Sequence, residues 1–132
     1  MTGSVLAGMK QLVESTEDEF GSLSQKKVLD IGCNDGSLLN YFKEKGAITV
    51  GVEPTDAAND STHETYKAFF DDEVSKKLHT LHGHFDFITF TNVFAHIENL
   101  PQLIKNLKKI ISWIIIIKHP HLIFKKQNKM LN

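Results

Sequence analysis

A glycine turn between an apolar run and an amphipathic segment constrains this chain more than any other feature of its sequence. The apolar run covers residues 28–31, the turn covers residues 32–36, and leucine and aromatic residues recur at helical spacing over residues 37–45. Glycine lets a backbone bend sharply or lets a ligand come close. A helix after such a turn points its first backbone N–H groups at that ligand. The stretch therefore predicts a buried strand, a turn and a helix around a ligand site.

Two classes of ligand use this geometry. Dinucleotide-binding folds carry G-x-G-x-x-G and seat a pyrophosphate on the start of the helix. Here Asn34 and Ser37 stand where the second and third glycines would be. The spacing of Asp30, Gly32 and Gly36 instead matches the acidic-x-Gly-x-x-x-Gly turn of enzymes that bind S-adenosylmethionine (SAM). The spacing favours SAM, and an NAD-type dinucleotide-binding domain stays open as the alternative.

A carboxylate closes the next predicted strand. Residues 48–52 form an apolar, β-branched run that ends at Glu53, and Pro54 then prevents the strand from continuing. Glu53 follows Gly36 at close to the roughly 20-residue spacing expected for an acid that binds a ribose. A carboxylate can accept hydrogen bonds from both hydroxyls of a ribose diol. Glu53 is therefore the expected ribose-binding residue.

The remaining pattern predicts further alternating elements. Apolar residues at helical spacing predict helices over residues 5–20 and 100–111, and an aromatic, β-branched run predicts a central strand over residues 85–90. Short helices are expected after Thr55 and after Asp71, with a weak strand over residues 63–68 between them. This alternation of strands and helices is typical of an α/β protein with a parallel sheet.

Three segments together resemble the class I SAM-dependent methyltransferases. They are VLDIGCNDGSLLNYF, GVEPT and TNVFAHIENL, and the resemblance runs over residues 9–112. More narrowly, they are similar to the sugar C-methyltransferases, which methylate nucleotide-linked deoxysugars. The resemblance implies a three-layer, Rossmann-like α/β fold with a parallel sheet in the order 3-2-1-4-5. It also implies SAM as the methyl donor, S-adenosylhomocysteine (SAH) as its product, and a small-molecule acceptor such as a nucleotide-sugar.

The resemblance also implies where the cofactor binds, because ligands of parallel α/β sheets gather at the carboxyl ends of the strands. The expected cofactor-binding residues are Asp30, Gly32, Asn34, Gly36, Glu53, Phe69 and Asn92. Phe69 would stack on the adenine, but it could equally be a core residue. Asp30 could instead hold the backbone amides of the turn.

SAM already carries an activated methyl group, so the protein must bind it, align it and, where required, remove a proton from the acceptor. His96 is the candidate base because a histidine titrates near neutral pH, although it could also pack beside the cofactor. The family's Tyr-His-Glu-His-like acid–base motif and its cysteine-rich zinc segment are absent from these 132 residues. We therefore expect cofactor binding with weak or absent transfer. A non-catalytic SAM-binding remnant and a methyltransferase for another substrate class stay open.

Composition argues against several other classes of protein. The net charge of −1 gives no electrostatic basis for binding nucleic acid or an anionic membrane surface. Cys33 is the only cysteine, which excludes an internal disulfide and a multi-thiolate zinc site, and it is expected to be a small turn residue rather than a nucleophile. The histidines at positions 79, 82 and 84 lack the spacing of a metal site. With no signal sequence and no apolar run of spanning length, a cytoplasmic protein is expected.

The length suits a single domain. We expect a partial SAM-binding domain over residues 1–117 and a basic C-terminal tail over residues 118–132, so that the last two strands of the family's sheet are missing. The predicted fifth strand, residues 112–117, would then expose an apolar, unpaired edge, which is an association hazard. An aggregation-prone monomer or a homodimer through that edge is expected.

Overall fold

The structure is a computed structural model that describes residues 3–90, 100–111, 113–118 and 121–126 of the chain. Four parallel strands form the central sheet in the order β3-β2-β1-β4. The strands are β1 (Lys27–Ile31), β2 (Ile48–Val52), β3 (Glu64–Tyr66) and β4 (Phe87–Phe90). The predicted order is therefore confirmed for its first four members.

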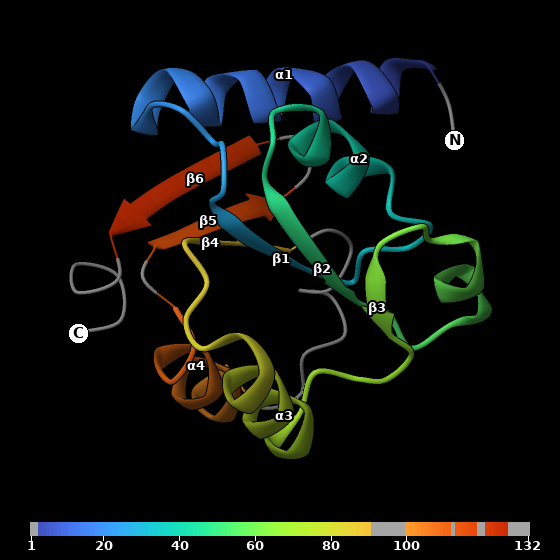
Figure 1. The fold of residues 1–132 in the computed structure, drawn as a ribbon, viewed down its shortest axis with the longest axis vertical. Coiled ribbons are helices and arrows are strands. Elements are labelled where there is room, and N and C mark those ends of the chain that lie inside the picture. Colours follow the sequence, from blue (N-terminus) through green and yellow to red (C-terminus); the bar gives the residue numbers. More distant parts are fainter. Residues whose placement is uncertain (1–2, 91–99, 112, 119–120, 127–132) are drawn as a thin grey trace.

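Helices cover both faces of this sheet (Figure 1). On one face lie α1 (Gly3–Phe20) and α2 (Ser37–Glu44), and on the other lie α3 (Asp72–His82) and α4 (Leu100–Lys108). A short 3-10 helix, η1 (Asp56–Asp60), connects β2 to β3. The three-layer α/β fold expected from the resemblance is confirmed. The described part of the chain contains no helix that is both long and apolar enough to cross a membrane.

The C-terminal strands differ from the expectation. β5 (Trp113–Lys118) lies beside β4, but its hydrogen-bonded partner is β6 (His121–Lys126), and the two form a separate antiparallel sheet (Figure 1). The sequence predicts no strand within residues 118–132 and leaves the fifth strand unpaired. The apolar residues at positions 122–124 instead pair with the isoleucine run at 115–117, which gives the tail segment a strand partner. Phe85, just before β4, and Ile111, just before β5, form an isolated parallel bridge.

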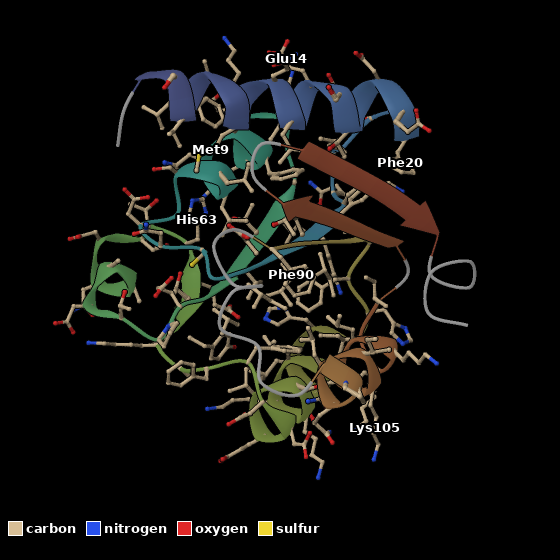
Figure 2. All side chains as sticks on the ribbon, turned by 180° about the vertical axis from the view of Figure 1, so that it is seen from behind. Met9, Glu14, Phe20, His63, Phe90 and Lys105 are labelled. Carbon is tan, nitrogen blue, oxygen red and sulfur yellow. The ribbon has the colours of Figure 1, made fainter. Side chains whose placement is uncertain are left out.

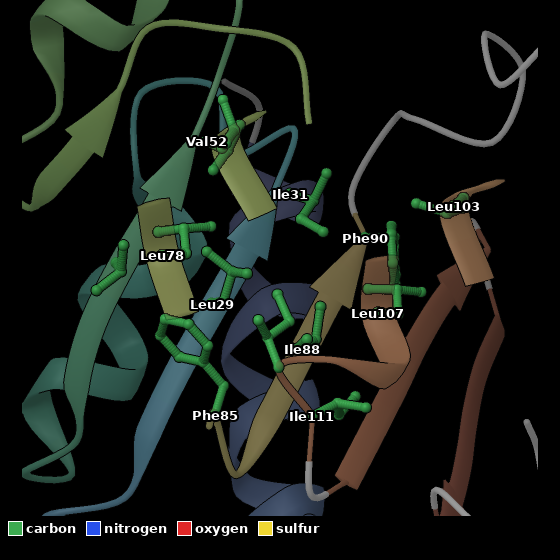
Figure 3. Packing of buried hydrophobic residues seen from close by; sticks show 13 residues of the cluster. Leu29, Ile31, Val52, Leu78, Phe85, Ile88, Phe90, Leu103, Leu107 and Ile111 are labelled. Atoms are coloured by element: carbon green, nitrogen blue, oxygen red, sulfur yellow. The ribbon is translucent and has the colours of Figure 1, made fainter. Parts of the chain in front are cut away.

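Each face of the central sheet has its own hydrophobic cluster. The cluster under α3 and α4 is shown in Figure 3 and includes Leu29, Ile31, Val52, Leu78, Phe85, Ile88, Phe90, Leu103, Leu107 and Ile111. The cluster under α1 and α2 includes Leu12, Val13, Val28, Leu38, Leu39, Phe42 and Phe87. Met9 and Phe20 of α1 pack against this second cluster, whereas Glu14 points away from the sheet (Figure 2). Strands β1 and β4 are buried on both faces, which explains their almost continuously apolar sequences.

Candidate functional site

The glycine turn joins β1 to α2 in a conformation that few residue types adopt. Gly32, Asn34 and Gly36 all have positive φ angles, of 78°, 55° and 85°. Glycine takes such angles without steric cost, and asparagine is the side-chain residue that tolerates them best. The backbone N–H groups of Gly32 and Cys33 donate to the carbonyl of Val52 at 2.8 and 3.2 Å. The turn is therefore fixed against the carboxyl end of β2.

Glu53 follows β2 directly and contacts the same turn. Its Oε1 accepts a hydrogen bond from the backbone N–H of Asn34 at 2.9 Å. Its Oε2 accepts from the backbone N–H and the hydroxyl of Thr55, at 3.0 and 2.8 Å. The side chain is only 7% exposed, and these three bonds fix its orientation. The structure thus brings together the carboxylate and the glycine turn that the sequence analysis assigned to one site.

Asp30 lies deeper than the turn. It is fully buried in β1, and its Oδ1 accepts a hydrogen bond from the hydroxyl of Thr89 in β4 at 2.8 Å. Asp30 therefore joins the two central strands just below the turn. Its expected contact with a cofactor stays a prediction.

Asp35 occupies the start of α2. Its Oδ1 accepts hydrogen bonds from the backbone N–H and the hydroxyl of Ser37 at 3.0 and 2.6 Å. A carboxylate therefore already lies at the positive end of this helix, where a dinucleotide fold would bind its pyrophosphate. A second anion there would be repelled, whereas a cationic ligand would be attracted.

The sequence of this chain matches a known protein family, independently of the similarity in fold. Residues 8–124 match the family described as a methyltransferase domain. The chain belongs to this family. The match confirms the methyltransferase resemblance drawn from the three sequence segments.

Individual relatives of this methyltransferase domain agree with the family. The C-methyltransferase NovU of Streptomyces niveus is 28% identical over 127 residues, which cover 92% of this chain and 30% of that protein. Among solved structures, the N-terminal domain of EvdMO1 with SAH bound gives a TM-score of 0.63 at 14% identity, covering 82% of this chain and 48% of the other. The plantazolicin methyltransferase BpumL, solved with SAH, gives 0.60 at 19% identity, covering 85% and 44%. This chain spans less than half the length of each of these proteins.

Cys33 points from the turn of the methyltransferase domain into the core. It is 3% exposed, and a Cβ added to Gly51 of β2 would lie 2.6 Å from its Sγ. Burial, with the nearby carboxylates of Asp30 and Glu53, raises the pKa of the Cys33 thiol to about 12. The group is a protonated thiol at neutral pH. These observations favour the interpretation of Cys33 as a small packing residue over that of a nucleophile.

Phe69 lies in the connection between β3 and α3 and is 74% exposed. The alternative that it is a core residue is therefore wrong, whereas its neighbour Phe70 does pack against the α3–α4 cluster. Asp71, the next residue, caps α3 because its Oδ1 accepts from the backbone N–H of Val74 at 2.9 Å. An exposed aromatic ring held beside an anchored helix start is available for stacking, and its adenine contact stays a prediction.

Two expected site residues, Asn92 and His96, lie outside the described residues, and their cofactor and base roles stay predictions. The strand that leads to them ends at Phe90, which pairs with Ile31 just before the glycine turn. Within the described ranges, no cluster of three metal-binding side chains occurs. One residue that sequence reasoning left without a role, His63, lies against the turn. A Cβ at Gly36 would be 2.8 Å from its Cδ2.

Proposed function

We propose that this chain is the SAM-binding part of a methyltransferase that acts on a small molecule. The observation that carries the proposal is the hydrogen bond from the Asn34 backbone N–H to Glu53 Oε1, because it joins the glycine turn and the carboxylate into one unit. In this proposal the turn of residues 32–36 lies against the amino-acid part and the ribose of SAM. Phe69 stacks on the adenine, and Asn92, which follows β4 in the sequence, completes the site.

The carboxylate of Glu53 has capacity for a ribose hydroxyl. A carboxylate offers about four acceptor positions, and the backbone N–H groups of Asn34 and Thr55 and the Thr55 hydroxyl use three of them. Oε1 carries only one of these bonds. These contacts leave one acceptor position on Oε1 for a ribose hydroxyl, and the contact with both hydroxyls stays a prediction.

The position of Asp35 supports SAM over NAD. Its carboxylate accepts the hydrogen bonds at the start of α2, so a pyrophosphate would meet a like charge where dinucleotide folds bind it. SAM carries a positively charged sulfonium and no phosphate. The proposal is tested by melting the protein with saturating SAM, SAH or NAD. SAM and SAH should raise the melting temperature and NAD should not, since ligands stabilise the state that they bind. A shift with NAD alone, or with none of the three, would contradict it.

The acceptor is a finer proposal. The C-methyltransferase NovU is the relative that suggests a carbon acceptor, and the sugar C-methyltransferase resemblance suggests a nucleotide-linked sugar. His96 is proposed as the base that removes a proton. A radiolabelled methyl-transfer assay with nucleotide-sugars tests this. SAH binding without transfer to any nucleotide-sugar would favour the non-catalytic remnant or another acceptor class, and transfer that survives His96→Gln would remove His96 as the base.

A homodimer and a cytoplasmic location also stay predictions. Because β6 pairs with β5 along its whole length, a second copy would have to add to one of the outer strands, such as β3 or β6. Analytical ultracentrifugation tests the dimer. A sedimentation coefficient that does not change with protein concentration, at the value of a 14.9 kDa monomer, would contradict it.

A further inference from the structure

His63 is a buried titratable side chain that the proposed reaction does not use. It lies just before β3, is 8% exposed, and sits between α2 and the segment that leads into β3 (Figure 2). Its Nδ1 lies 2.7 Å from the hydroxyl oxygen of Thr49 in β2, and its Nε2 lies 2.7 Å from Oδ1 of Asn40 in α2. The ring therefore joins a strand of the central sheet to the helix that follows the glycine turn.

A neutral ring satisfies both of these contacts. Because the carbonyl oxygen of Asn40 only accepts, Nε2 must carry the proton and donate to it. Nδ1 then accepts from the hydroxyl of Thr49. Both ring nitrogens are paired without any positive charge. An imidazolium would bury a charge and would have to turn the Thr49 hydroxyl from donor to acceptor.

The ring edge also fills the space next to the turn. A Cβ at Gly36 would lie 2.8 Å from Cδ2 of His63 and 2.9 Å from Oγ of Ser61. Ser61 Oγ in turn accepts hydrogen bonds from the His63 backbone N–H and the Thr65 hydroxyl, at 3.2 and 2.8 Å. A displacement of the ring would therefore change the packing around Gly36, the last residue of the turn, and around the start of α2.

We propose that His63 is a positioning residue that couples cofactor binding to protonation, with the neutral ring holding the glycine turn in its binding conformation and the imidazolium releasing it. The inference rests on the proposed placement of SAM at residues 32–36. It concerns a side chain that does not itself touch the ligand in that proposal.

The groups that face the ring favour its neutral form. Burial lowers the pKa of His63 below its ordinary value of 6.5, the positive charge of Lys43 on α2 lowers it further, and the backbone carbonyl of Gly36 acts in the opposite direction. The contacts from β2 and from the preceding loop, Thr49 and Ser61, are uncharged. His63 takes up a proton at lower pH in the folded state than in the unfolded state. Its contribution to the free energy of unfolding is therefore fully present above about pH 6.5 and is lost as the pH falls from there to the folded pKa.

The test is the dissociation constant of SAH measured by calorimetry between about pH 7.5 and about pH 5.5. The wild-type protein should bind at least roughly threefold more weakly at the lower pH, because protonation and binding oppose each other. His63→Gln keeps an amide that can donate to Asn40 but cannot titrate, so its affinity should be nearly independent of pH. The matched control is His79→Gln, which removes an exposed histidine of α3 and should keep the wild-type profile.

A second measurement uses the wild-type protein alone and does not depend on the folding of a variant. Nuclear magnetic resonance titration of the His63 ring should give a lower pKa with saturating SAH than without it, because coupling between two binding events is reciprocal. An unchanged His63 pKa, or the same pH profile for wild type and His63→Gln, would overturn the inference while leaving the proposed function intact. Absence of SAH binding at every pH would overturn the proposed function, and the inference with it.

Discussion

Position 36 disfavours every residue other than glycine for two reasons. Its φ angle of 85° lies in the left-handed region, which costs other residues about 1–2 kcal/mol. Its missing Cβ also leaves the space that His63 and Ser61 occupy. The conformation of the glycine turn thus depends on neighbours from the segment between η1 and β3.

Gly36→Ala should therefore lower the free energy of unfolding by at least about 1 kcal/mol, because it combines left-handed strain with a contact below 3 Å. The matched control is Gly8→Ala in α1, where a Cβ would meet nothing within 4 Å. This control should be stabilising, by up to about 1 kcal/mol, because alanine is the better helix former. Urea unfolding of the two variants checks both signs. Equal effects at the two positions would contradict the account of the turn.

The start of α3 depends on one side chain. Asp71 Oδ1 accepts from the backbone N–H of Val74 at 2.9 Å, and loss of such a cap typically costs about 0.5–2 kcal/mol. Asp71→Ala should be destabilised by that amount, whereas Asp71→Ser should retain most of the stability because a hydroxyl can replace the carboxylate as acceptor. Thermal unfolding followed by circular dichroism distinguishes the two variants. Matching losses for alanine and serine would show that the cap is not what stabilises this helix.

Elements with a strong local pattern could be predicted from sequence. The apolar runs of β1 and β4 and the amphipathic spacing of α1 need no knowledge of the fold. β6 could not be predicted, because its short apolar run at 122–124 lies between histidines and lysines and becomes a strand only through its partner β5. Leu81 of α3 follows the buried Leu78 at helical spacing but is itself 59% exposed, so spacing alone does not decide burial here.

Some residues of the candidate site could also be predicted from sequence, and others could not. Glu53 and the glycine turn could be paired in advance because fixed spacing and the common end of parallel strands bring them together. The position of His63 could not be predicted, because its role depends on Thr49 and Asn40, which reach it only in the folded chain. The choice between core and surface for Phe69 also required the structure, since two adjacent phenylalanines have opposite burial here.

The two hydrophobic clusters share the central sheet and should unfold together. Leu39 of the α1–α2 cluster and Leu78 of the α3–α4 cluster are both fully buried. Each replacement by alanine should cost about 2–5 kcal/mol, because it removes buried methyl groups and leaves a cavity. In urea, circular dichroism and intrinsic fluorescence should give one coincident transition for each variant. If Leu78→Ala separated the two signals, the layers would be unfolding independently.

The buried carboxylate of Glu53 has a consequence for the thermodynamics of recognition. Amides and a hydroxyl of the protein already hold its oxygens in place, so a ribose bound as proposed would not have to order this side chain. Immobilising a long, flexible acid typically costs up to about 2 kcal/mol, and here that entropy is lost when the chain folds rather than when the ligand arrives. Substitutions that loosen the molecule near this acid should therefore weaken affinity through entropy, even where every contact with the ligand is retained.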